Sequence, residues 1–495
     1  MKRYSQDRAL FTDLYQVTMA QGYFGLGLED KKATFNLFFR SNPFDGGYAI
    51  CCGLAPALEY LTKLKFSEGD LAYLEKQGIF TPDFIEYLRR FSFTGSVDAV
   101  KEGSLVFPFE PILQVTAPII EAQLVETALL NIINYSTLIA TKTRRIVVSA
   151  RNNRVVDFGL RRAQGDGAYL GTRAALVGGA VGTSFVKAGQ LFNAPIIGTH
   201  AHSWVELFES ELDSFKGYAK VFPDNCTLLI DTYNVLGSGL DNAITIAQRM
   251  RQKGKELKGV RIDSGDLAYL SFEVYKRFVE EGFPDVNIVL SSDLDEYVIE
   301  SIINQIETGE GKIPKKEREL RKKTTQHLFF GVGTKLITGG NQSALGGVYK
   351  LVELDGEPRI KLSENPIKST IPSMKRLFRL QDKNTGAYKG DVIALKRENI
   401  PEKGDWLYHP INEMKKYQVD ENFKVVEILK PVIIDGKRLD DSNKKTTWKE
   451  IQDFSENQLE NLNYTHKRLL NPHIYKVSIT GALREMKNQL VAKHS

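Results

Sequence analysis

The middle of the chain alternates short apolar runs with helix-like segments. Five apolar runs each end in polar residues, and the first four begin roughly 30 residues apart, the length of one strand-plus-helix unit. They are PIIGTH (195–200), TLLIDTYN (227–234), GVRIDSGD (259–266), NIVLSSD (287–293) and FFGVGTK (329–335). Parallel strands buried on both faces are continuously apolar, as these are, and residues 240–252 and 267–281 between them predict helices. The pattern therefore predicts an irregular α/β barrel over residues 141–345.

The flanking regions have a different pattern. Residues 34–39 predict a strand, and residues 71–78 and 81–90 predict short amphipathic helices, so residues 1–140 are expected to form an N-terminal α/β domain. Beyond the barrel, Asp355-Gly356 and Asn384-Thr385-Gly386 lie between strand-like runs and predict hairpins. Residues 346–495 are therefore expected to form a C-terminal, mixed, β-rich cap domain. The expected fold class is α/β.

Composition and charge narrow the class of protein. The 495 residues are 42% hydrophobic and 26% charged, which is enough to bury several cores. The net charge of +5 is too weak to imply a nucleic-acid partner, but it is compatible with phosphorylated small substrates. The basic segment 311–326 is expected to be a solvated helix or loop on the barrel exterior, in preference to a nucleic-acid patch.

Targeting and cysteine patterns point to the cytoplasm. The apolar stretch 118–140 contains Glu121, Glu126 and several amides, which favours a buried helix over a membrane span. The N-terminal residues show no apolar core of a secretory signal. Three cysteines, two of them adjacent, do not form a disulfide framework. We therefore expect a reduced, cytoplasmic protein that does not act at a membrane.

Candidate chemistry collects at the polar ends of the runs, because the carboxyl ends of parallel barrel strands meet at one mouth. Arg261 and Asp263 share one face of an extended strand, and Ser264 and Asp266 follow at a glycine turn. Carboxylates at such a turn hold ribose hydroxyls or hydrated magnesium, although Ser264 or Asp266 also suits a helix N-cap.

Three other segments carry weaker signals of the same kind. Residues 157–167 place Phe158 beside Arg161 and Arg162, which suits stacking and anion binding but also a surface arginine pair. Gly331, Gly333 and Thr334 suit a phosphate, although glycine-rich turns are common. Polar ends also follow two more of the runs, at Asp231-Thr232 and at Ser291-Ser292-Asp293.

The stretch GTHAHSW (198–204) uses two of the seven histidines. A metal-dependent barrel hydrolase would use His200 and His202 as two ligands, but the later strand ends supply no further histidine. Ser203 and Glu206 have the spacing of a capping box, which predicts a helix beginning near Trp204. His202 would then lie immediately before a helix N-terminus, where a phosphoryl group is favoured.

Taken together, these motifs resemble the nicotinate phosphoribosyltransferase family over nearly the whole chain. They are TDLYQVTMAQGY (12–23), FGLRRAQG (158–165), GTHAHSW (198–204), DTYN (231–234), VRIDSGDL (260–267) and FGVGT (330–334). The resemblance implies a type II phosphoribosyltransferase fold and a homodimer with shared active sites. It also implies the synthesis of nicotinate mononucleotide and pyrophosphate from nicotinate and phosphoribosyl pyrophosphate in NAD salvage. ATP would be a co-substrate, hydrolysed through a phosphohistidine, and Mg²⁺ would accompany both phosphate substrates.

The resemblance also assigns residues. His202 would be the phosphohistidine, and Arg261 and Asp263 would meet phosphoribosyl pyrophosphate. The other substrate-binding residues would be Tyr15 (from the partner subunit) and Phe158 around the pyridine ring, Arg161, Ser184 and Thr199 in the base site, Asp231 at its strand end, and Ser292, Asp293, Gly333 and Thr334 at the ribose and its 5-phosphate.

Two alternative functions are compatible with the same fold. A nicotinamide-using relative would carry an Asp in a Gly-Thr-Asp stretch, whereas this chain has Gly182-Thr183-Ser184. An Asp beside a carboxylate substrate would repel it, and a Ser would not. The second alternative, a non-catalytic nucleotide-binding protein, does not account for the full set of motifs.

Overall fold

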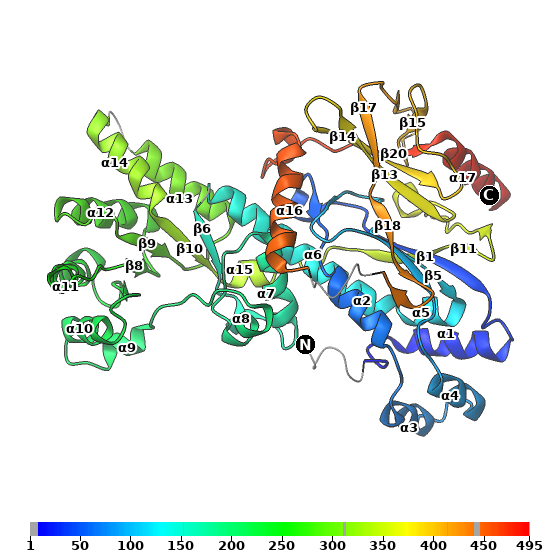
Figure 1. Ribbon diagram of the computed structural model, residues 1–495, viewed down its shortest axis with the longest axis horizontal. Helices are drawn as coiled ribbons and strands as arrows, with labels where there is room; N and C mark the ends of the chain where they lie inside the picture. The colour runs from blue at the N-terminus through cyan, green and yellow to red at the C-terminus, as the bar shows by residue number, and fades with distance from the viewer. Residues whose placement is uncertain (1–7, 152, 310–312, 413, 440–445, 495) are drawn as a thin grey trace. The chain divides into compact units, whose positions relative to one another are not determined.

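The structure is a computed structural model that describes residues 8–151, 153–309, 313–412, 414–439 and 446–494 (Figure 1). The chain divides into two compact units, one formed by Met1–Thr141 with Ala344–Ser495 and the other by Lys142–Ser343. The unit boundaries lie close to the ends predicted for the barrel. The two flanking segments belong to one unit and share a sheet, as described below.

The first unit contains a seven-stranded sheet and a six-stranded sheet. The seven-stranded sheet has the order β12-β11-β1-β5-β3-β18-β19, with strands Glu357–Pro358, Val348–Leu354, Lys32–Phe38, Leu113–Pro118, Ser96–Val100, Leu429–Ile434 and Lys437–Arg438. The six-stranded sheet has the order β16-β15-β20-β14-β13-β17, with strands Lys416–Gln418, Trp406–Tyr408, Val477–Thr480, Tyr388–Leu395, Lys375–Asp382 and Phe423–Glu427. A two-stranded sheet pairs β2 (Ala49–Ile50) with β4 (Leu105–Val106).

Both hairpins that the turn residues predict are present in this unit. Asp355 and Gly356 have φ of 50° and 81° between β11 and β12, as a tight hairpin turn requires. Between β13 and β14, Gly386 has φ of 74° and the Asp382 carboxylate accepts hydrogen bonds from the amides of Asn384 and Thr385. Local turn chemistry therefore sets the register of these strands.

The helices of the first unit include those expected near its start. They are α1 (Leu14–Gly25), α2 (Leu54–Lys63), α3 (Glu68–Lys76), α4 (Pro82–Arg89), α5 (Ile119–Leu124), α16 (Trp448–Asn461) and α17 (Gly481–His494), with short turns η1 (Pro43–Asp45), η4 (Pro366–Lys368) and η5 (Tyr464–His466). Helix α6 (Glu126–Ser149) crosses the unit boundary. The continuous stretch Ile119–Ser149 is long and apolar enough to cross a membrane by length and composition alone, but 67% of its apolar window is buried inside the structure.

The second unit is built on five parallel strands in the order β6-β10-β9-β8-β7. These are β6 (Arg154–Asp157), β7 (Thr227–Leu229), β8 (Gly259–Ile262), β9 (Asn287–Leu290) and β10 (Leu328–Val332). The last four coincide with apolar runs of the sequence, and helices α11–α14 flank them (Figure 1). The parallel α/β arrangement predicted for this region is therefore confirmed.

Single contacts extend this sheet at both edges and curl it toward closure. Beyond β6, Asp157 forms a parallel bridge with Thr183, and Thr183 forms another with Ile196. Beyond β7, the Leu229 amide donates a hydrogen bond to the His200 imidazole at 3.2 Å. The prediction of a strand over 195–200 was wrong, because only Ile196 pairs in this way and Pro195 has no N–H to add to a ladder. The expected irregularity of the barrel lies at this seam.

Helices connect the strands of the second unit. They are α7 (Gly167–Gly178), α8 (Val186–Phe192), α9 (His202–Glu206), α10 (Glu211–Val221), α11 (Leu240–Gln252), α12 (Leu267–Glu280), α13 (Glu296–Thr308), α14 (Lys315–Gln326) and α15 (Thr334–Ile337), with short turns η2 (Leu160–Arg162) and η3 (Val235–Gly239). The basic segment forms α14, a largely exposed helix packed on α12 and α13, while residues 311 and 312 lie outside the described residues.

Candidate functional site

Arg261 is the centre of the polar cluster at the carboxyl ends of the strands. Its guanidinium forms an ion pair with Asp263 at 3.2 Å and donates to the Ser291 hydroxyl at 2.9 Å and to the Thr199 hydroxyl at 3.3 Å. Its terminal carbon also lies 5.7 Å from the centre of the Phe158 ring. The planar guanidinium thus links the ends of β8, β9 and β6 with Thr199. The prediction that Arg261 and Asp263 share a face is confirmed.

Asp231 and Asp266 are the other two carboxylates near this turn of the chain. One oxygen of Asp231 accepts the Asp263 amide at 2.8 Å and the Ser264 hydroxyl at 2.7 Å. The other oxygen is buried and has no hydrogen-bond partner among the described residues. Asp266 caps α12 by accepting the Tyr269 amide at 3.1 Å. The helix N-cap predicted for this turn is therefore Asp266, and Ser264 donates its hydroxyl to Asp231 instead.

His202 faces the unpaired oxygen of Asp231. Its Nε2 lies 4.0 Å from that oxygen, and its Nδ1 lies 3.1 Å from the Thr232 hydroxyl. The His202 side chain is 41% exposed while the Asp231 side chain is fully buried. An imidazole that lies beside a buried carboxylate, and is still open to solvent, can accept a group from a bound molecule.

The start of the helix differs from the prediction. Helix α9 begins at His202 itself, its N-cap is Ala201, and Ser203 makes no capping hydrogen bond. The capping box predicted from Ser203 and Glu206 was therefore wrong. At five residues this helix contributes little dipole, so the environment of His202 depends on Asp231 and Thr232.

His200 has a different role from His202. Its Nε2 accepts the Leu229 amide, and its Nδ1 lies 3.4 Å from the Ala201 carbonyl, so the neutral ring carries its proton on Nδ1. The ring packs against Tyr218 at 4.7 Å between ring centres, and burial lowers the pKa of His200 to about 4. Both nitrogens are occupied, and among the described residues no group of three His, Cys, Asp or Glu side chains could hold a metal ion. The described residues therefore offer no set of metal ligands for the metal-dependent hydrolase alternative.

Three of the predicted base-site residues lie on segments next to β6. Phe158 follows β6, Arg161 is exposed on η2, and half-buried Ser184 follows the bridge residue Thr183. A Cβ at Gly331 would lie 2.3 Å from the Phe158 ring. The absence of a side chain at Gly331 therefore makes room for the aromatic ring, a use that the phosphate interpretation of this glycine did not foresee.

The predicted ribose and phosphate residues occupy strained or tight backbone. Ser292 and Asp293, exposed at the end of β9, both have positive φ, at 99° and 41°. Two successive non-glycine residues in this region store strain of a kind that clusters at binding sites. Gly333 is the N-cap of α15, and Thr334 is its first residue. These residues lie at the same ends of the sheet as Arg261, because the strands are parallel.

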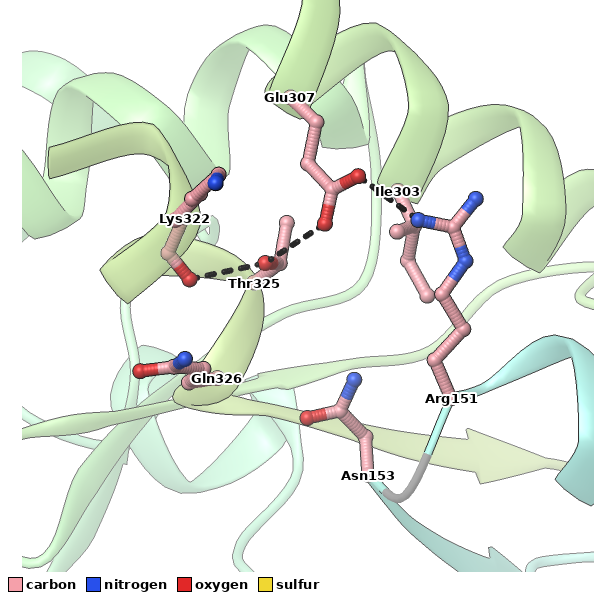
Figure 2. Close-up of a pocket in the computed structure, with 7 residues that line it drawn as sticks. All are labelled: Arg151, Asn153, Ile303, Glu307, Lys322, Thr325 and Gln326. Carbon is pink, nitrogen blue, oxygen red and sulfur yellow. Dashed lines mark hydrogen bonds and ion pairs between the residues drawn. The ribbon is translucent and has the colours of Figure 1, made fainter. Parts of the chain in front are cut away.

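One predicted site residue, Tyr15, and the cavity of Figure 2 are not part of the polar cluster. Tyr15 is on α1 of the first unit, where its side chain is 48% exposed. The cavity drawn in Figure 2, of about 360 Å³, adjoins the amino-terminal ends of β6 and β10 and so lies at the edge opposite the polar cluster. Glu307 is paired there with Arg151 at 2.7 Å and with the Thr325 hydroxyl at 3.3 Å.

Sequence reasoning missed one acid at the strand ends. Asp157 is the last residue of β6 and fully buried, and its carboxylate accepts three hydrogen bonds. The signal that identified the other polar ends was present, since Asp157 follows the apolar pair Val155-Val156. That run was too short to be counted with the five longer ones.

An incomplete parallel α/β barrel whose strand ends gather a guanidinium, carboxylates and glycine turns has the features of an enzyme site suited to a phosphorylated substrate. Profiles described as the nicotinate phosphoribosyltransferase N-terminal domain, family and C-terminal domain match residues 10–134, 153–396 and 374–487.

Relatives in other organisms agree with these profiles. Nicotinate phosphoribosyltransferase of Bacillus subtilis is 42% identical over 478 residues, covering 95% of this chain and 93% of its own length. The Caenorhabditis elegans enzyme of the same name is 34% identical over 548 residues, covering 97% and 93%. The crystal structure of human nicotinic acid phosphoribosyltransferase matches with a TM-score of 0.81 at 29% identity, covering 97% of this chain and 99% of that one.

The chain therefore belongs to the nicotinate phosphoribosyltransferase family. This membership confirms the resemblance, the fold class and the enzyme class that the sequence motifs predict, and it indicates a role in NAD salvage.

Proposed function

We propose that this enzyme joins nicotinate to phosphoribosyl pyrophosphate, forming nicotinate mononucleotide and pyrophosphate, and couples the reaction to ATP hydrolysis through a phosphorylated His202. The observation that carries the proposal is the position of Arg261. One guanidinium spans the predicted base side, at Phe158 and Thr199, and the carboxylate side, at Asp263. That arrangement suits a reaction that brings an aromatic base and a charged sugar phosphate together.

The transfer step needs no nucleophile from the protein. The ring nitrogen of nicotinate attacks C1 of the ribose, the bond from C1 to the pyrophosphate oxygen breaks, and pyrophosphate leaves with the electron pair. Catalysis then depends on aligning the two substrates and stabilising charge, tasks for Phe158 and Arg261.

Mg²⁺ is proposed to arrive with the phosphate substrates. Asp231 supplies a carboxylate oxygen, the type of ligand that hydrated Mg²⁺ prefers, and this oxygen is buried without a hydrogen-bond partner in the described part of the chain. Both oxygens of Asp263 are engaged by Arg261 and Ser291, so the fit to the ion rests on Asp231. Bound there, it would supply positive charge to the pyrophosphate.

The coupling step uses the two nitrogens of His202 differently. With its Nε2 proton directed at Asp231, the ring keeps a lone pair on Nδ1, which faces the Thr232 hydroxyl. Nδ1 attacks the γ-phosphorus of ATP, a phosphorus–nitrogen bond forms, and ADP leaves. The Asp231 carboxylate stabilises the positive charge that the ring acquires. Water later hydrolyses the phosphohistidine and releases phosphate.

Product formation from nicotinate and from nicotinamide, with and without ATP, tests this function directly. The expected result is nicotinate mononucleotide as the main product and a higher yield with ATP. Preference for nicotinamide would contradict the substrate assignment. A tightly held stoichiometric zinc in chelator-free protein would revive the hydrolase alternative.

The substitution Ser184→Asp is expected to raise the KM for nicotinate roughly fivefold or more, because a like charge near the substrate carboxylate costs about 1 kcal/mol even in a watery site. Steady-state kinetics with varied nicotinate measure the effect. Ser184→Asn, similar in size but neutral, is the matched control and should retain most of the affinity. An unchanged KM in Ser184→Asp would place Ser184 away from the carboxylate.

The active enzyme is proposed to be a homodimer in which Tyr15 of one chain completes the site of the other. The exposure of Leu14, Tyr15 and Met19 on α1 supports this, since exposed apolar clusters mark interaction surfaces. Mixing Tyr15→Ala with Arg261→Ala chains is expected to restore about a quarter of wild-type activity, because half the dimers would be mixed and each would hold one intact site. Absence of restored activity, after subunit exchange is verified by native mass spectrometry, would contradict a shared site.

A cytoplasmic location is part of the same proposal. All three cysteines, Cys51, Cys52 and Cys226, are free and buried. Free thiols suit a reducing compartment.

A further inference from the structure

Asp157 joins two segments that carry predicted base-site residues. One carboxylate oxygen accepts the Gly159 amide at 2.8 Å, at the start of the turn that presents Arg161. The other accepts the hydroxyl of Thr183, beside Ser184, at 2.9 Å. A third bond comes from the Thr172 hydroxyl of α7, also at 2.9 Å.

The backbone reinforces the link between β6 and the Ser184 segment. The Asp157 amide donates to the Gly182 carbonyl at 3.0 Å, and the Ser184 amide donates to the Asp157 carbonyl at 2.8 Å. Thr183 is thereby held extended, with its hydroxyl directed at Asp157 and also accepting the Phe185 amide at 3.0 Å. Successive side chains of an extended segment point in opposite directions, so fixing Thr183 inward fixes Ser184 outward.

The other side of the carboxylate is equally confined. A Cβ at Gly159 would lie 2.9 Å from the Asp157 carboxylate and 2.5 Å from Ile337. The turn that leads to Arg161 is therefore closely packed against the acid. Burial raises the pKa of the Asp157 carboxyl, whereas its three hydrogen bonds lower it. A fully buried acid with all its partners inside the protein has no ligand to bind, and its effect is on geometry.

We infer that Asp157 is the positioning residue of the base site, and that it sets the selectivity for a carboxylate over a carboxamide by fixing Ser184 and the Arg161 turn on one carboxylate. The inference rests on the proposed function, because it assigns these two residues to nicotinate. It separates Asp157, whose contacts hold only the base-site segments and α7, from Arg261, which spans the base side and the carboxylate side.

Two hydroxyls on the same carboxylate provide a matched pair of variants. Thr183 and Thr172 are both fully buried, and each donates one bond of the same length to the same oxygen. Thr183→Val releases the segment of Ser184, whereas Thr172→Val releases only α7. Each variant keeps the shape of the side chain. Thr172→Val removes one hydrogen bond, whereas Thr183→Val removes two, because the Thr183 hydroxyl also accepts the Phe185 amide, so Thr183→Val should lose more stability.

Thr183→Val is expected to raise the KM for nicotinate roughly tenfold, the value of about one lost hydrogen bond, and to reduce the preference for nicotinate over nicotinamide. The KM for phosphoribosyl pyrophosphate should stay within about twofold of wild type, a change worth less than half of one hydrogen bond. Thr172→Val should leave both constants unchanged, and Thr183→Ser should restore the nicotinate KM.

Three outcomes would overturn the inference. These are an unchanged nicotinate KM in Thr183→Val, an equal rise in Thr172→Val, or an equal rise in both substrates' KM values. Thermal melting of each variant shows that the compared proteins are folded, and Thr183→Ala, which also removes the hydroxyl, replaces the valine variant if that protein does not fold. A wild-type enzyme that does not use nicotinate would instead refute the proposed function, so the two failures are distinguishable.

Discussion

His202→Ala is expected to abolish labelling of the protein by γ-labelled ATP and to abolish ATP hydrolysis, while some ATP-independent transfer remains. The label is lost because the imidazole that faces Asp231 and Thr232 is gone. Transfer survives because pyrophosphate leaves without a nucleophile from the protein. Acid-labile label, ADP release and nicotinate mononucleotide formation are measured on the same preparations.

Two other histidines are controls for this result. His200→Ala should keep the label, because its ring is occupied by the Leu229 amide and the Ala201 carbonyl. His327→Ala should also keep the label, because His327 is half-buried against Tyr275 just before the start of β10, at the opposite end of the strand from the polar cluster. If label survives in His202→Ala and disappears in His200→Ala, the assignment within the pair is reversed. Label in both variants would place the phosphohistidine elsewhere.

Arg261→Ala is expected to lower kcat/KM for phosphoribosyl pyrophosphate by about 10- to 100-fold, since a charged hydrogen bond is worth about 1.5–3 kcal/mol. The loss should exceed that of any single neighbour, because Asp263, Ser291 and Thr199 all depend on the same guanidinium. Steady-state kinetics with varied phosphoribosyl pyrophosphate provide the measurement, and circular dichroism verifies folding.

Arg261→Lys separates charge from geometry. Lysine keeps the positive charge but cannot reproduce the planar fork, so an intermediate loss is expected. Arg249→Ala, on the exposed side of α11, removes an arginine of the same unit without touching the cluster and should be neutral. Wild-type constants in Arg261→Ala would place this residue outside the substrate site.

The barrel strands were predictable because burial on both faces leaves a continuous apolar signal. Residues 227–229, 259–262 and 287–290 are strands within the predicted runs, and strand 328–332 begins one residue before its run. The run at 195–200 carried the same signal but pairs only at Ile196. Apolar composition records that a segment is buried, and it does not record whether a neighbouring backbone is placed to pair with it.

The residue types at the strand ends were predictable from the sequence, but several of their contacts were not. Arg261 and Asp263 meet as their alternation requires. The environment of His202 was not predictable from local spacing, because Thr232 and Asp231 lie about 30 residues further along the chain and meet it only after folding. The capping box failed for a related reason. The Ser203–Glu206 spacing is necessary for that motif, but tertiary contacts decide which residue begins the helix.

Asp157 shows what sequence patterns do not resolve. Its position at the end of a short apolar run is the same as that of Asp231, yet one acid is satisfied by three donors while the other keeps an unpaired oxygen. Residue type and spacing are alike in the two cases. The difference arises from side chains contributed by distant segments.

The seam of the barrel has a consequence for how the enzyme moves. It is closed by isolated contacts, the Thr183–Ile196 bridge and the bond from the Leu229 amide to His200, instead of a continuous ladder. Local opening there costs less free energy than unfolding the five-stranded sheet, so the Leu229 amide should exchange with solvent deuterium before the amides of β8 and β9. Each opening carries Thr199 away from Arg261 and His202 away from Asp231 together, and any ligand that binds only the closed seam slows the exchange. We therefore expect the arrangement of His202 to depend on whether the seam is closed.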